Sequence, residues 1–105
     1  MAYRVVILKG ALAEYVQILR YLDENLGNKQ AARDFAEEFE RQTALVAENP
    51  HLHALSRLPE LAAKGYRSYF VKRYVVLYKI KDDLVVVAHI FHQTQNYARL
   101  VRPEE

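Results

Sequence analysis

The chain has 105 residues, no cysteine and a formal net charge of +2, with 51% hydrophobic and 27% charged residues. This composition is typical of one globular domain with a single core, and it excludes a disordered chain, a disulfide-stapled protein and cysteine-based catalysis. No apolar run approaches the roughly 18 residues of a membrane span, and the N-terminus lacks a signal-peptide pattern, so we expect a cytoplasmic protein with no membrane partner.

The first strand and the first helix are marked by a change of periodicity. Residues 3–8 are rich in β-branched and aromatic types and predict a strand that stops at Lys9-Gly10. Apolar side chains then recur at spacings of three and four up to Leu26, which predicts one face of a helix that ends at Gly27.

A second helix follows almost at once. Asn28 can cap it by accepting a hydrogen bond from a free amide of the first turn, and Asn49-Pro50 ends it. Because little more than Gly27-Asn28 separates the two helices, we expect them to lie antiparallel as a hairpin that covers one face of a sheet. The inward stripe of the second helix comprises Ala32, Phe35, Ala36, Phe39, Thr43 and Val46.

The second half of the chain supplies the sheet. Residues 51–64 predict an irregular connection with a short helical turn at 59–63. The three segments that follow have strand composition and are separated by Lys72-Arg73 and Asp82-Asp83, which predict tight turns. The predicted strands are residues 66–71, 74–81 and 84–92.

The predicted fold class is therefore α+β, in the order β-α-α-β-β-β, with an antiparallel-rich sheet and a helical hairpin packed on one face. We expect a single domain over residues 1–105, in which residues 94–105 form a short tail. We expect the other face of the sheet to be uncovered and to carry the function.

Charge is divided unevenly along the chain. Residues 11–50 hold four basic and eight acidic side chains, whereas residues 51–102 hold nine basic and three acidic ones. A basic half of this kind is typical of a surface that meets a polyanion or an acidic partner. A solvated surface of mixed charge has the same composition.

Four sequence features together resemble one toxin family over nearly the whole chain. They are the segment AARDFAEEF in the second helix, the Asn49-Pro50 stop, the pair Tyr66-Arg67 at the start of a strand, and the block RYVVLYKIKDDLVVVAHIFHQTQNYARL. In this order they are similar to the RelE/ParE superfamily, the toxins of type II toxin–antitoxin (plasmid stabilisation) systems. The resemblance implies a cognate antitoxin that wraps the toxin, and it implies no cofactor.

The superfamily holds two functional classes, and the fold alone does not choose between them. RelE-like toxins enter the ribosome and cut mRNA, whereas ParE-like toxins poison DNA gyrase without being enzymes themselves. Our leading hypothesis is a metal-independent, ribosome-dependent mRNA endonuclease that arrests translation. The alternatives are a gyrase poison of the ParE type and a degenerate toxin that only binds its antitoxin.

Under the nuclease hypothesis, the resemblance points to Arg67, His92 and Tyr97 as catalytic residues. RNA cleavage needs a group that stabilises the charged phosphorane, as a planar arginine does, and groups that move protons, as histidine does near neutral pH. Each has a structural alternative: an ion-paired strand arginine, a polar end to a buried strand, and a tyrosine that packs the tail. Strand alternation places His89 opposite His92, so we expect His89 to be structural.

The remaining polar and basic residues bear on three questions: whether the chain is a nuclease or a binding module, whether it holds a metal, and where it would contact RNA. Residues 93–96 are neutral where some nuclease members carry a second cation, which favours a binding module. His51 and His53 have an HxH spacing without a matching carboxylate or cysteine, so no metal site is predicted. The basic residues expected to dock on ribosomal RNA, or simply to be solvated, are Arg57, Lys64, Lys72 and Arg73.

Overall fold

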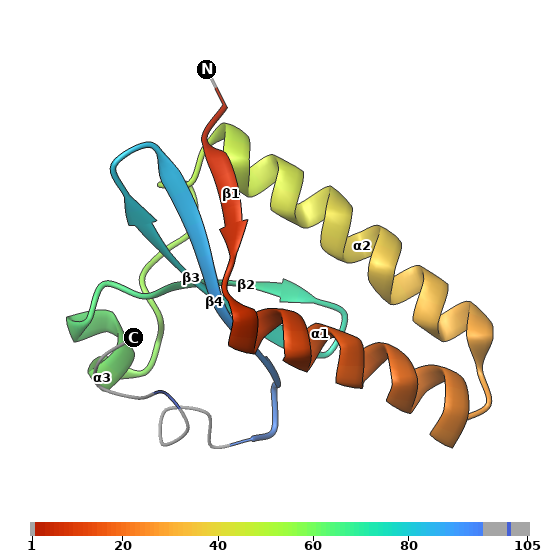
Figure 1. Cartoon of the computed structure of the whole chain (residues 1–105). Coiled ribbons are helices and arrows are strands. Elements are labelled where there is room, and N and C mark those ends of the chain that lie inside the picture. The colour runs from red at the N-terminus through yellow and green to blue at the C-terminus, as the bar shows by residue number, and fades with distance from the viewer. Residues whose placement is uncertain (1, 96–100, 102–105) are drawn as a thin grey trace.

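The computed structural model describes residues 2–95 and residue 101, and they form an α+β fold around a four-stranded sheet (Figure 1). The predicted fold class and the helical hairpin are confirmed. The elements are β1 (Arg4–Ile7), α1 (Lys9–Arg20), the π-helical segment η1 (Tyr21–Asn25), α2 (Lys29–Glu48), α3 (Pro59–Ala63), β2 (Arg67–Val71), β3 (Tyr74–Lys81) and β4 (Leu84–His92). No helix in the described part of the chain is long and apolar enough to cross a membrane.

The sheet has the strand order β1-β4-β3-β2. Strands β2, β3 and β4 form the predicted antiparallel meander, and β1 pairs in parallel with β4, from Arg4 opposite Leu84 to Ile7 opposite Val87. Each hairpin turn begins with a residue of positive φ, Lys72 at 56° and Asp82 at 55°. This backbone conformation matches the twist of the strands that a two-residue turn must join, and it confirms both predicted turns.

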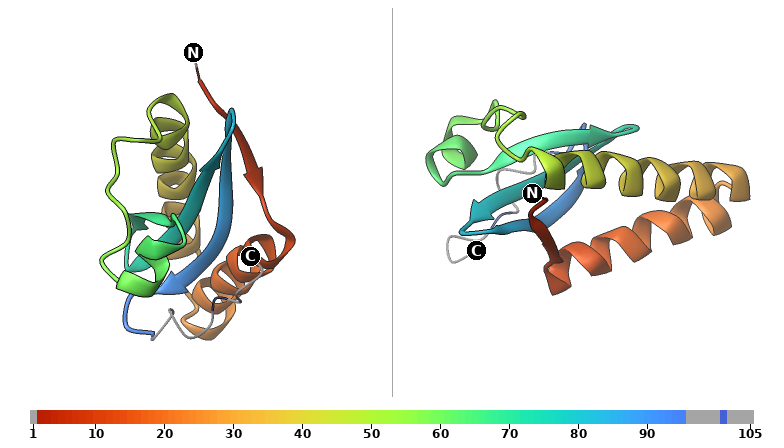
Figure 2. Two further views of the ribbon diagram at one scale, coloured as in Figure 1. Left: turned by 90° about the vertical axis from the view of Figure 1, so that its left-hand side faces the viewer. Right: turned by 90° about the horizontal axis from the view of Figure 1, so that it is seen from above.

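The helical hairpin converges at its closed end and opens towards the sheet (Figures 1 and 2). Helix α2 begins as predicted, because the amide of Ala31 donates to the Asn28 side chain at 3.0 Å. Gly27, with φ of 61°, lies in the connection between the helices. The expected break at Lys9-Gly10 was placed too late, because α1 already starts at Lys9 and holds Gly10 in its first turn.

Both faces of the sheet are covered, so the expectation of an open face was wrong. On one face the hairpin contributes Phe35, Phe39 and Val46 to a cluster with the side chains of all four strands. On the other face Leu61 of α3 and Val101 of the tail pack against the strands. This second cluster comprises Leu61, Tyr66, Val75, Leu77, Ala88, Phe91 and Val101.

A β-bulge in β4 decides which side chains face the hairpin. Tyr78 of β3 pairs with Val87, but the neighbouring Leu77 pairs with His89, so one residue of β4 is extra at this point. Val85 and Val87 pack in the hairpin cluster before the bulge, and Ile90 does so after it. The bulge therefore turns the end of β4, including His92, towards the hairpin.

Candidate functional site

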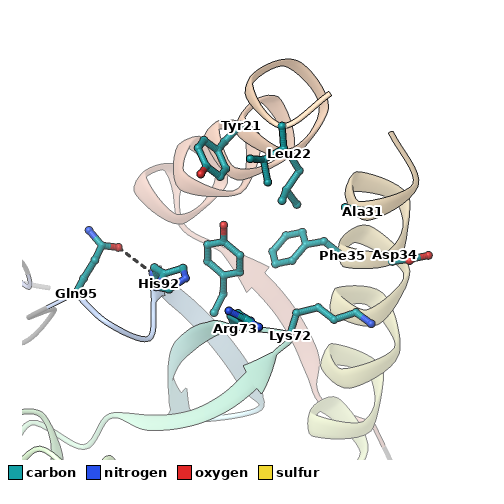
Figure 3. Close-up of a pocket in the computed structure, with 11 residues that line it drawn as sticks. Tyr21, Leu22, Ala31, Asp34, Phe35, Lys72, Arg73, His92 and Gln95 are labelled. Carbon is teal, nitrogen blue, oxygen red and sulfur yellow. Dashed lines mark hydrogen bonds between the residues drawn. The ribbon is translucent and has the colours of Figure 1, made fainter. Parts of the chain in front are cut away.

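A pocket of about 890 Å³ lies where the closed end of the hairpin meets the β2–β3 turn and the end of β4 (Figure 3). Its floor is apolar. Phe35 of α2 is 1% exposed, and its ring meets the ring of Tyr74 edge-on, with centroids 5.2 Å apart. Burial, followed by the nearby Tyr21, raises the pKa of the Tyr74 phenol. Tyr21 and Leu26, by contrast, are 48% and 56% exposed, so the pocket has an open apolar mouth.

The rim of the pocket is basic. Lys72 and Arg73 are exposed in the β2–β3 turn and line the side opposite the helical connection. Asp34 of α2 also borders the pocket, but its carboxylate accepts a hydrogen bond from Gln30 and points away from the hollow (Figure 3). The pocket therefore offers positive charge beside apolar surface.

His92 closes the pocket at the end of β4. Its ring meets that of Tyr74 edge-on, with centroids 5.3 Å apart. The amide of Thr94 donates to Nδ1 of His92 at 3.2 Å, and the Thr94 hydroxyl lies 2.7 Å from the same nitrogen. Because Nδ1 accepts a hydrogen bond, the neutral imidazole carries its proton on Nε2. Gln95 accepts a hydrogen bond from the His92 amide at 2.9 Å and fixes this corner (Figure 3).

Arg67 lies at the other end of the hairpin face. Its Nη1 donates to the carbonyl oxygen of His53 at 2.6 Å, and its backbone forms an isolated bridge with Leu55. The Arg67 charge also acts on the pKa of Tyr78, which burial raises to about 12 and the guanidinium lowers in part. Arg67, the first residue of β2, therefore fastens the connection that follows α2 to the edge of the sheet.

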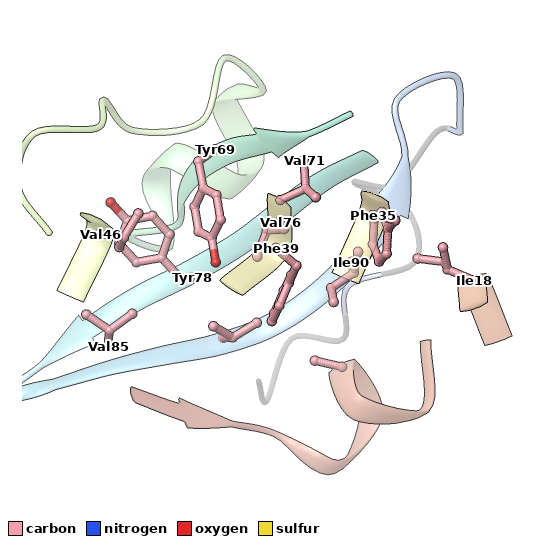
Figure 4. Close-up of a cluster of buried hydrophobic side chains, with 12 residues drawn as sticks. Ile18, Phe35, Phe39, Val46, Tyr69, Val71, Val76, Tyr78, Val85 and Ile90 are labelled. Carbon is pink, nitrogen blue, oxygen red and sulfur yellow. The ribbon is translucent and has the colours of Figure 1, made fainter. Parts of the chain in front are cut away.

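The structure does not bring Arg67 and His92 together. Arg67 and Val71 are four positions apart along strand β2, and Val71, Tyr74 and His92 are successive partners across three strands. At about 3.3 Å per residue and about 4.8 Å per strand, the two Cα atoms are roughly 16 Å apart. The buried side chains of Tyr69 and Phe39 belong to the cluster that fills the hairpin face (Figure 4).

The other predicted residues are scattered. Tyr97 lies outside the described residues. Arg57 and Lys64 are exposed on either side of α3, away from the pocket, and Gln93 is exposed beyond β4. Among the described residues, no group of histidine and acidic side chains is arranged to hold a metal ion.

The apolar floor was missed by the sequence analysis. Tyr21 was its clearest signal, because it interrupts the inward stripe of the first helix with a large aromatic residue on another face. Tyr74 was a second signal, since it follows directly after two cations in a tight turn. Neither signal reveals that the two tyrosines, 53 positions apart in the sequence, line one pocket.

Comparison with known proteins identifies a family that matches most of the chain. Residues 5–97 match the family described as ParE toxin of type II toxin–antitoxin system, parDE. No curated protein matches the chain.

Two solved structures share the fold. The chromosomal ParDE toxin–antitoxin system from P. aeruginosa has a TM-score of 0.69 at 14% identity, over 87% of this chain and 96% of that one. The toxin–antitoxin complex RelBE2 from Mycobacterium tuberculosis has a TM-score of 0.61 at 21% identity, over 88% of this chain and 99% of that one.

Proposed function

The chain belongs to the ParE toxin family of type II toxin–antitoxin systems, and on this premise we propose that it poisons DNA gyrase by binding it, without cutting RNA. The RelE-like and ParE-like classes share a fold, so the choice between them depends on the site. A cognate antitoxin is the expected partner in either class.

The separation of Arg67 from His92 is the observation that carries this proposal. A group that transfers a proton must lie within about 3 Å of the atom it serves, and a cation that stabilises the phosphorane must touch the same phosphate. The Cα atoms of Arg67 and His92 are roughly 16 Å apart along and across the strands. With its guanidinium held by the His53 carbonyl, Arg67 does not share a phosphate with His92 in this arrangement. This contact supports a structural role for Arg67.

Cleavage of mRNA on the ribosome is the second candidate, and one observation favours it. Lys72, Arg73 and His92 line the same pocket as Tyr74. In this candidate function, Arg73 would stabilise the phosphate in place of Arg67. The Nε2 nitrogen of His92 would transfer the proton. This candidate still assigns no metal ion and no cofactor.

The first experiment measures gyrase directly. Purified gyrase and supercoiled plasmid are incubated with the protein, and trapped cleavage complexes are counted as linear DNA after detergent and protease treatment. We expect linear DNA to accumulate with the protein and not with the heat-denatured protein. In cells, we expect a DNA-damage response while translation is initially intact.

The second arm tests cleavage of RNA. Primer extension on an mRNA in a purified translation system should show intact message with the wild type and with His92→Ala, Arg73→Ala and Arg67→Ala. Ribosome-dependent cuts that fall about a hundredfold in the His92 and Arg73 variants would instead establish the nuclease. A folded protein that causes no growth defect on induction would identify a degenerate toxin.

A further inference from the structure

We propose that the free edge of strand β1 is an interface between two copies of this chain, which pair antiparallel through β1 and join their sheets into one. This surface is not used by the proposed function. None of the described residues that line the pocket belongs to β1 or to the first half of α1. Strand β1 lies at the outer edge of the sheet, beside β4 (Figure 2).

The backbone of β1 is paired on one side only. The amide of Arg4 donates to the Asp83 carbonyl at 3.1 Å, and the amide of Leu8 donates to a carbonyl of β4 at 2.9 Å. Because successive residues of a strand direct their backbone groups to opposite sides within the sheet, Val5 and Ile7 present their amides and carbonyls to the free edge. In the part of the chain that the structure describes, no strand lies beyond β1.

The residues of this edge do not protect it from pairing. Proteins usually protect an edge strand with charged side chains, with proline or with a covering loop. The start of β2, at the other edge, is covered by a loop, because Leu55 bridges to Arg67. The Ser56 amide also donates to the Tyr66 carbonyl there, at 2.8 Å. Residues 5–8 at the β1 edge are all apolar, and the last three of them are between 37% and 39% exposed.

A second copy of the chain fits this edge by symmetry. When two β1 strands lie antiparallel with Val6 facing Val6 of the partner copy, Val5 of each copy pairs with Ile7 of the other. The outward amides and carbonyls of both residues are then satisfied together. A register shifted towards the start of β1 would need Tyr3, whose amide already donates to a carbonyl of α2 at 2.7 Å. A shift towards the end of β1 would need Lys9, which already lies in α1.

The charges at the ends of β1 favour this arrangement. In the register centred on Val6, the exposed Lys9 comes next to the β3–β4 turn of the partner copy, where Asp82 and Asp83 are exposed as well. Opposite charges placed across an interface attract each other. The two Arg4 side chains lie at opposite ends of the paired strands and do not face each other. Lys81 belongs to β3, on the far side of β4 from the edge.

The apolar surface continues from β1 along α1, but the interface is small. Leu8 is followed at four-residue spacing by Leu12 and Val16, which are 51% and 42% exposed. A pairing of four-residue strands buries less than the roughly 1,200–2,000 Å² of a stable complex. We therefore expect a weak dimer that dissociates on dilution.

Sedimentation velocity of the purified chain between about 1 µM and about 500 µM tests this interface. We expect the mass to rise from that of one chain to that of two. Val6→Lys and Val6→Glu each place like charges across the symmetry axis, so each should weaken the dimer by at least about fivefold. An equimolar mixture of the two variants should dimerise again, because Lys and Glu then face each other.

A backbone variant and a matched control complete the design. Ile7→Pro removes an amide hydrogen that faces the free edge and leaves the bonds to β4 in place, so it should abolish the dimer and keep the fold. Phe70→Lys adds the same charge at the β2 edge, where Phe70 is 48% exposed, and its Kd should stay within about twofold of the wild type. Circular dichroism and thermal unfolding of each variant check the fold.

Hydrogen exchange locates the contact. The Val5 and Ile7 amides should gain protection as the concentration of the chain rises.

Three outcomes would overturn the inference. One is a chain that stays monomeric up to the highest concentration. Another is a dimer whose Kd is the same in the Val6 variants and in Ile7→Pro, which would place the contact on another surface. The third is protection of the Val5 and Ile7 amides only when another protein is bound, which would show that the edge pairs with a strand of that protein. None of these outcomes bears on the trapping of gyrase, so the interface and the proposed target are tested separately.

Discussion

Two buried tyrosines, Tyr69 and Tyr78, connect distant parts of the chain through side-chain hydrogen bonds. Tyr69 and Tyr78 lie side by side in the cluster under the hairpin, where they are 2% exposed and fully buried, respectively (Figure 4). Tyr69 shares a hydrogen bond of 2.7 Å with Thr43, and Tyr78 donates to the Pro50 carbonyl at 2.6 Å. Burial raises the pKa of each phenol to about 12; the Thr43 bond lowers that of Tyr69 in part, as Arg67 does that of Tyr78.

These pKa values predict a loss of stability in alkali. An unfolded tyrosine ionises with a pKa of about 10, so the unfolded chain releases these protons before the folded chain does. The free energy of unfolding is therefore unaffected by these groups below pH 10. Between pH 10 and 12 it should fall by roughly 1.4 kcal/mol per pH unit for each tyrosine.

Urea unfolding at pH 9, 10 and 11 measures this effect. The control is the double variant Tyr69→Phe/Tyr78→Phe, which cannot ionise at these positions and should lose less stability between pH 10 and 11 than the wild type. An equal loss in both proteins would mean that other groups control the alkaline transition.

At the scale of elements, Glu14 joins α1 to the part of β4 that β1 does not reach. Strand β1 ends opposite Val87, and three residues later the amide of Ile90 donates to the Glu14 carboxylate at 2.9 Å. The other oxygen of Glu14 lies 3.5 Å from Nδ1 of His89. The side chain thus replaces a strand partner at the end of the sheet.

Removing this acceptor should destabilise the packing of α1 on β4. Glu14→Ala leaves the Ile90 amide without its partner, and we expect a loss of about 1–2 kcal/mol in the free energy of unfolding. Glu14→Gln keeps an acceptor oxygen and should lose less than half as much. Urea denaturation and hydrogen exchange at the Ile90 amide measure both variants, and equal losses would show that charge rather than the hydrogen bond matters here.

Most elements followed from local sequence, because each is marked by its own periodicity and end signals. The strands β3 and β4 have the predicted bounds, and Asn28 caps α2 as expected. The bulge in β4 could not be predicted, because the run Leu84 to Ala88 that leads into it is apolar on both faces and gives no alternation to count. The direction of His92, and with it the site, depends on that bulge.

At the scale of the whole molecule, the two covered faces of the sheet explain why the site lies at an end of the fold. The sequence predicted a hairpin on one face but not that α3 and Val101 would pack on the other, since a five-residue helix and a single valine carry little pattern. The pocket likewise joins the acidic half of the chain to the basic half, through α2 and the β2–β3 turn. Such long-range contacts have no local signal.

The second cluster predicts that Val101 contributes to the stability of the domain. Val101 is 6% exposed and packs with Leu61, Tyr66 and Phe91 on the face away from the hairpin. Val101→Ala removes buried methyl groups and should lower the free energy of unfolding by about 1–2 kcal/mol. Val6→Ala makes the same change at a residue that is 39% exposed, and it should cost less than about 0.5 kcal/mol. Equal costs in urea unfolding would mean that Val101 does not pack on this face in solution, and that the sheet is open there to a partner.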